Sequence, residues 1–209
     1  MRIISIGEIL WDVYKDEEYI GGAPFNFSVH LNILGHEVYF ISAVGSDLRG
    51  DLGLQCVSNY GLTTKYISRV KHCPTGYVDV TIGIDGFPAY NIHRPAAYDF
   101  PSLTSEQIND IISFKADWLY FGTVQQMSAA ARELTCNLIE LLPKTRRFYD
   151  MNLRDGHYTK DLVRELLMVS SILKLNSDET QICCELFGKK PMELKDFCRW
   201  LIKTFELCP

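Results

Sequence analysis

A short loop of small residues followed by a polar side chain is the stretch best suited to bind a ligand. Gly21 and Gly22 permit tight backbone turns and close approach of a ligand, and Pro24 is suited to the first turn of a helix. The free N–H groups of that helix start would face the loop, and the Asn26 amide can donate and accept hydrogen bonds. This combination suits a polyhydroxylated ligand. A tight strand-to-helix turn without a ligand explains the same residues equally well.

Acidic side chains follow the first apolar segment of the chain. Glu8 and Asp12 come after Arg2–Ile6, a near-continuous apolar run typical of a strand covered on both faces. Open α/β sheets bind ligands at the carboxyl ends of such strands. Asp12 can accept hydrogen bonds from two hydroxyl groups, and the alternative is a solvated acid in a loop.

Two polar segments end later strands, Asp150-x-Asn152-x-Arg154 and Asn176-x-x-Glu179. Together with the glycine loop they indicate a polar small molecule plus an anion. Phosphates would meet Asn176 and, through a metal ion, Glu179. A helix cap is the alternative for this second pair, because a Glu at the third helical position bonds back to the cap residue.

The elements that position these side chains alternate between strand and helix. Strands are predicted at 2–6, 37–44, 117–121, 147–151 and 171–175. Helices are predicted at 24–34, 48–60, 104–112, 129–142, 160–168, 176–187 and 191–205, with Asp47 as an N-cap and Thr104-x-x-Gln107 as a capping box. The order predicts an α/β fold over residues 1–209: a doubly wound, mostly parallel sheet with helices on both faces.

A β-rich block interrupts this alternation. It comprises 66–70, 76–84 and 88–94, with Asp85-Gly86 as a hairpin turn signal. We expect it to leave the main sheet as a small flap joined by the arm at 13–20, so that lid strands are inserted at about 13–21 and 74–96. Arg94 would then close over an anionic or hydroxylated ligand. A surface ion pair is the alternative for Arg94.

Composition limits the classes of partner. The 209 residues are 47% hydrophobic, carry a formal net charge of −5 and contain no run of Lys or Arg. That balance argues against nucleic acid or an anionic membrane surface as the main partner. Seven cysteines occur without CxxC pairs, which favours reduced thiols in a cytoplasmic protein.

Five ordered motifs together resemble the ribokinase-like (PfkB) carbohydrate kinases. They are Gly21-Gly22-Ala23-Pro24-x-Asn26, Val44-Gly45-x-Asp47-x-x-Gly50, Pro74-Thr75-Gly76, Asp150-x-Asn152-Leu153-Arg154 and Leu175-Asn176-x-x-Glu179. The Gly-Gly-Ala-Pro form is most similar to the fructokinase branch.

The resemblance implies a β lid and ATP-dependent phosphorylation of a sugar hydroxyl with Mg²⁺. By resemblance, Asp12, Gly22 and Asn26 would hold the sugar, and Arg94 and Arg154 would reach the sugar or the transferred phosphate. Asn176 and Glu179 would serve the phosphate–Mg²⁺ end. Lid strands of this family often pair between subunits, so a homodimer through residues 77–92 is a further hypothesis.

One family motif is missing from the sequence. The family's Gly-Ala-Gly-Asp segment carries the general-base Asp and the anion hole, and no Gly-x-Gly-Asp occurs here. We expect the general base beyond Pro209 and little kinase activity from these 209 residues. The alternative is a non-catalytic sugar-binding or regulatory module. A dinucleotide-binding oxidoreductase is disfavoured, because no Gly-x-Gly-x-x-Gly follows the first strand.

Overall fold

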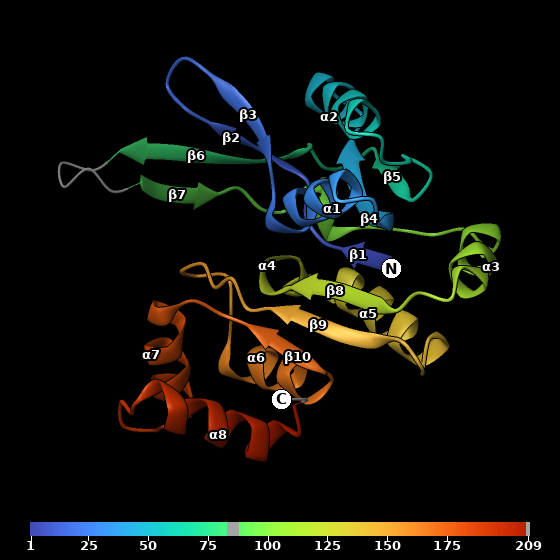
Figure 1. The fold of residues 1–209 in the computed structure, drawn as a ribbon. Helices are drawn as coiled ribbons and strands as arrows, with labels where there is room; N and C mark the ends of the chain where they lie inside the picture. The colour runs from blue at the N-terminus through green and yellow to red at the C-terminus, as the bar shows by residue number, and fades with distance from the viewer. Residues whose placement is uncertain (83–87, 208–209) are drawn as a thin grey trace.

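Two β-sheets form the framework of the computed structural model, which describes residues 1–82 and 88–207 (Figure 1). The large sheet has six strands in the order β10-β9-β8-β1-β4-β5, and every neighbouring pair is parallel. Its strands are β1 (Arg2–Ile6), β4 (Glu37–Gly45), β5 (Ile67–Val70), β8 (Trp118–Gly122), β9 (Arg146–Asp150) and β10 (Ile172–Lys174).

Helices cover both faces of the large sheet, as predicted. On one face, α1 (Ala23–Ile33) and α2 (Leu48–Asn59) bury Phe25, Val29 and Val57 against Ile3 of β1. The other face carries α3 (Ser105–Phe114), α5 (Ala129–Leu141), α6 (Lys160–Met168), α7 (Ser177–Leu186) and α8 (Leu194–Phe205). Adjacent residues of β1 therefore enter different cores, which is why its sequence is apolar without alternation.

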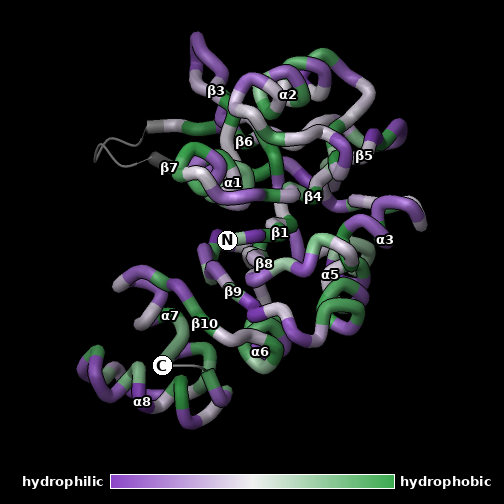
Figure 2. The backbone as a smooth tube through the Cα atoms, turned by 45° about the vertical axis from the view of Figure 1, so that its right-hand side comes forward, coloured by the Kyte–Doolittle hydropathy of each residue, from purple (hydrophilic) through white to green (hydrophobic). Residues whose placement is uncertain are grey.

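The last helix shows how its sequence pattern selects a buried face. Phe197, Leu201 and Phe205 recur every four residues and are buried, and green and purple segments alternate along α8 in Figure 2. Glu193 is the N-cap residue of α8, so the predicted start at Pro191 is three residues too early.

The small sheet contains β2 (Leu10–Val13), β3 (Glu18–Gly21), β6 (Gly76–Ile82) and β7 (Pro88–Ile92), in the order β3-β2-β6-β7. Strand β2 pairs antiparallel with β3 and parallel with β6, and β6 pairs antiparallel with β7. The predicted turn at Asp85-Gly86 lies outside the described residues.

One segment assigned to the flap belongs to the large sheet instead. Strand β5 pairs parallel with β4 at the sheet edge. Tyr66 and Ile67 enter the cores on opposite faces of that sheet. The prediction of a flap strand at 66–70 was therefore wrong. The segment pairs with β4 because its side chains are buried on both faces of the large sheet.

The Asp47 side chain forms hydrogen bonds that link the end of β4 in the large sheet to the residue before β6 in the small sheet. Its carboxylate caps α2 by accepting the Gly50 N–H at 2.8 Å, as predicted, and it also accepts the Thr75 N–H at 2.8 Å and the Thr75 hydroxyl at 2.6 Å. Burial opposes ionisation here, but these hydrogen bonds outweigh it and lower the pKa of Asp47.

The six cysteines of the described residues have free thiols. No helix in the described part of the chain is both long enough and apolar enough to cross a membrane.

Candidate functional site

The polar segments singled out in the sequence gather at the carboxyl edge of the large sheet. Glu8 follows β1, and Asp150 is the last residue of β9, paired in register with Gly122 of β8 and Lys174 of β10. Because parallel strands end at the same edge, side chains far apart in the sequence meet there.

The glycine loop is packed against the residues after β1. Gly22 has φ +108°, and a Cβ atom there would lie 2.4 Å from the carbonyl oxygen of Glu8. Glycine is therefore required by contact with the chain itself as well as by the turn. Asn26, in the first turn of α1, is exposed, and its side chain makes no hydrogen bond to any described residue.

Asp12 lies in β2, so it is not a loop acid. Its carboxylate sits against β3, since a Cβ atom on Gly21 would be 2.5 Å from its Oδ2 atom. Partial burial raises the pKa of Asp12, and the nearby Arg154 guanidinium opposes that rise. The Asp12 side chain is half-buried, and it forms no ion pair within the described residues.

Arg94 is held in a buried ion pair. Its Nη2 and Nε atoms donate to Asp99 at 2.5 and 3.2 Å, and Nη1 donates to the Val124 carbonyl oxygen at 2.6 Å. The Arg94 and Asp99 side chains are only 15% and 4% exposed. Arg94 therefore forms a buried ion pair and not the surface ion pair considered as an alternative. Its guanidinium is also not free to close over a ligand, as the other interpretation expected.

Arg154 differs from Arg94 in having no carboxylate partner within the described residues. Its Nη1 atom donates to the Leu153 carbonyl oxygen at 2.9 Å, and its guanidinium carbon lies 5.6 Å from the ring centre of Tyr90 in β7. Arg154 therefore connects the sheet edge to the small sheet.

The Asn176–Glu179 pair forms the capping box that the sequence left as an alternative. The Asn176 side chain accepts the Glu179 N–H at 2.9 Å, and Glu179 Oε2 accepts the Asn176 N–H at 2.8 Å. Glu179 Oε1 also accepts the Leu153 N–H at 2.7 Å. Glu179 is 3% exposed, and its carboxylate joins the segments after β9 and β10.

These contacts do not fit direct metal binding by Glu179, because both oxygens already accept backbone N–H groups. Within residues 1–82 and 88–207, no group of three His, Cys, Asp or Glu side chains is arranged to hold a metal ion. A contribution of Glu179 to an Mg²⁺ site through intervening groups stays a prediction.

Glu8 is a site residue to which the sequence assigned no specific role. It is 4% exposed, and its Oε2 atom has no hydrogen-bond partner among the described residues. Burial, reinforced by Asp150, raises the pKa of Glu8 to about 7, although a hydrogen bond from its own backbone and, more weakly, Arg154 and Arg94 oppose the rise. The feature of the sequence that could have identified Glu8 as a site residue is its position directly after a buried strand.

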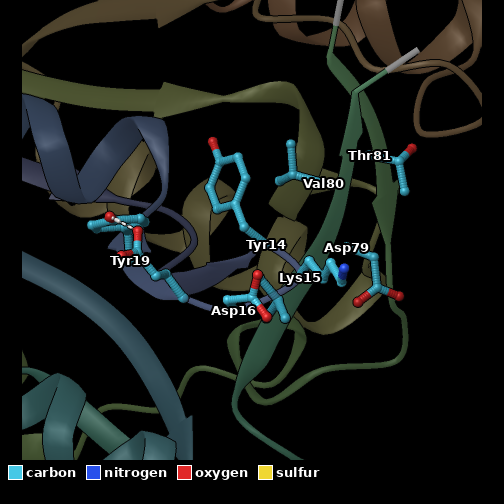
Figure 3. Close-up of a pocket in the computed structure, with 9 residues that line it drawn as sticks. Tyr14, Lys15, Asp16, Tyr19, Asp79, Val80 and Thr81 are labelled. Atoms are coloured by element: carbon cyan, nitrogen blue, oxygen red, sulfur yellow. Dashed lines mark hydrogen bonds between the residues drawn. The ribbon is translucent and has the colours of Figure 1, made fainter. Parts of the chain in front are cut away.

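A separate hollow of about 1050 Å³ lies beside the small sheet. Figure 3 shows Lys15 and Asp16 at the turn between β2 and β3, and Asp79 and Thr81 on β6, around this hollow. None of the predicted sugar-binding residues lines it.

Comparisons with known proteins agree with this architecture. The family model for pfkB family carbohydrate kinases matches residues 6–206. The chain is 29% identical over 164 residues to an uncharacterized sugar kinase of Pyrococcus horikoshii, an alignment covering 73% of this chain and 52% of that protein. It is 27% identical over 193 residues to 5-dehydro-2-deoxygluconokinase of Clostridium tetani, covering 85% and 56%.

A solved fructokinase from Xylella fastidiosa with bound ATP has the same fold. It superposes with a TM-score of 0.82 at 22% identity, over 97% of this chain and 65% of that one. The chain spans about half the length of the curated relatives named above.

Proposed function

Because the chain belongs to the pfkB family of carbohydrate kinases, we propose that it serves the transfer of the γ-phosphate of ATP to a sugar hydroxyl, with a fructose-like sugar as substrate, and that the 209 residues alone have little activity because no Gly-x-Gly-Asp segment occurs in them. The observations that support this proposal are the packing of Gly22 on Glu8 after β1, the position of the Asp12 carboxylate beside Gly21, and the Arg154 guanidinium 5.6 Å from the Tyr90 ring of the small sheet. The likeness to an ATP-bound fructokinase supports the choice of nucleotide and sugar.

Each polar side chain has a defined part in this proposal. The Asp12 carboxylate and the Asn26 amide bind sugar hydroxyls, since both lack side-chain partners among the described residues. Arg154 offers a cation to the sugar or to the transferred phosphate, whereas the donors of Arg94 already serve Asp99 and Val124. Asn176 and Glu179 order the phosphate end.

Replacing Asp12 with Ala is expected to weaken fructose binding at least about 30-fold, because two hydroxyl–carboxylate hydrogen bonds are lost. Isothermal calorimetry of this chain with fructose measures the effect, and Asn26→Ala is expected to act in the same direction. Asp16→Ala, which removes an exposed acid from the β2–β3 turn, is the matched control. Equal binding by Asp12→Ala and the control would exclude Asp12 from the site.

We further propose that two copies pair through their small sheets. Tyr19 in β3 and Tyr90 in β7 are 54% and 48% exposed, and both strands are sheet edges, which pair readily with other strands. Light scattering is expected to give the mass of two chains, and Tyr19→Lys to give one. Tyr60→Lys, at an exposed tyrosine outside this sheet, is the control, and a wild-type monomer at high concentration would refute the pairing.

A further inference from the structure

The first turn of α2 contacts three strands of the small sheet through one residue, Arg49. Its carbonyl oxygen accepts the indole N–H of Trp11 in β2 at 3.1 Å. Its guanidinium donates from Nε and Nη2 to the two carboxylate oxygens of Glu18 in β3, at 2.9 and 2.6 Å. The guanidinium carbon also lies 4.6 Å from the ring centre of Tyr77 in β6. A helix that packs on the large sheet is therefore tied to β2, β3 and β6.

These contacts are made on one face of the small sheet, and Asp12 lies on the opposite face. Trp11 and Tyr77 are paired in register between β2 and β6, so they share a face. Because successive side chains of a strand point to opposite faces, Asp12, the residue after Trp11, faces away from α2. Its Oδ2 atom accordingly lies against Gly21 of β3. Arg49 therefore holds, from the far side, the strand that carries Asp12.

The Arg49–Glu18 ion pair has the geometry of the stronger surface pairs. Both carboxylate oxygens accept from one guanidinium, and the two side chains are 32% and 40% exposed, so water screens the pair only in part. The Tyr77 ring under the guanidinium is stacked on the His93 ring, with 4.2 Å between the ring centres. His93 Nε2 in turn lies 2.6 Å from Asp79 Oδ2 in β6. The guanidinium therefore contacts a ring that is itself held within the small sheet.

We propose that Arg49 is a positioning residue for the sugar site, and that its contacts with β2, β3 and β6 set the orientation of the small sheet over the carboxyl edge of the large sheet. Asp47 holds the small sheet at one point, through Thr75 before β6, and Arg49 adds contacts to two further strands. A small sheet turned away from this edge would carry Asp12 away from the glycine loop. The choice of a sugar as ligand rests on the proposed function, whereas the hold of Arg49 on the small sheet can be tested without any ligand.

The first test measures hydrogen–deuterium exchange of the backbone amides of the small sheet. Exchange in β2 and β3 is expected to be about fivefold faster in Arg49→Gln than in wild type, because the paired hydrogen bonds to Glu18 are lost. Arg69→Gln is the matched control. Arg69 also pairs with an acid of α2, Asp51, at 2.5 Å, but it belongs to β5 of the large sheet. This control is expected to leave exchange in the small sheet unchanged.

The second test measures fructose binding by calorimetry. Arg49→Gln and Glu18→Gln are each expected to weaken binding about fivefold, and the double variant is expected to bind as well as Arg49→Gln alone, because both changes remove the same ion pair. Arg49→Lys, which keeps the charge but not the paired hydrogen bonds, is expected to retain part of the affinity. Urea denaturation of Arg49→Gln is expected to show no larger loss of stability than Arg69→Gln shows, which a general structural defect would exceed.

The outcomes separate the role of Arg49 from the identity of the ligand. A wild-type chain that does not bind fructose would overturn fructose as the ligand, while the exchange rates would still decide whether Arg49 holds the small sheet. Unchanged exchange in Arg49→Gln, unchanged fructose affinity in that variant, or additive losses in the double variant would each overturn the positioning role.

Discussion

Replacing Glu179 with Ala is expected to lower the free energy of unfolding by about 4 kcal/mol, because the N–H groups of Leu153 and Asn176 lose their acceptor. The Leu153 N–H is buried and costs about 1–3 kcal/mol when left unpaired, the N–H of the exposed Asn176 costs less, and the removed side chain leaves a cavity. Urea denaturation followed by circular dichroism measures the change, with a constant m-value as the sign that only stability has changed.

The neighbouring acid in the same helical turn supplies the control. Asp178 is exposed, and Asp178→Ala is expected to change stability by less than about 1 kcal/mol. If Glu179→Ala were as stable as this control, the carboxylate would not serve as the link between the two segments. Its position would then favour the phosphate role that the family resemblance implies.

The sequence was sufficient for the main sheet because its signals are local. The apolar run at Arg2–Ile6 predicted β1, and the cap residues Asp47 and Thr104 predicted the starts of two helices. The segment at 66–70 was assigned to the wrong sheet, since a short apolar strand does not encode its neighbour. That choice depends on which strand edge is free once the other elements have packed.

The sequence was sufficient to predict where the site lies, but not which side chains pair with one another there. The carboxyl ends of parallel strands must meet, so Asp150 and the glycine loop were expected at one edge. The partner of Arg94 is Asp99, five residues later, and this pairing depends on the turn that η1 (Ala97–Asp99) forms. Neither interpretation of Arg94 included this ion pair, because both placed the Arg94 side chain at the surface.

Replacing Glu8 with Gln is expected to stabilise the chain by up to about 3 kcal/mol above pH 7. Burial raises the pKa of Glu8 from 4.5 to about 7 in the folded chain. Between these pH values the folded state keeps a proton that the unfolded state releases, so the wild type loses stability as pH rises and levels off above about 7. Gln does not titrate, so the variant lacks this loss. Urea denaturation from pH 5 to pH 8.5 measures both profiles.

The direction of this effect separates a buried carboxylate that is kept for function from one that is kept for stability. A buried side chain kept for stability alone should lower stability when replaced, whereas a carboxylate kept for the site can raise it and weaken ligand binding. Glu37→Gln, at an exposed position on β4, is the control and is expected to follow the wild-type profile. A Glu8→Gln variant less stable than wild type at pH 8 would mean that partners of the carboxylate outweigh its burial. Greater stability of Glu8→Gln at pH 8 is the result that a pKa raised by burial requires.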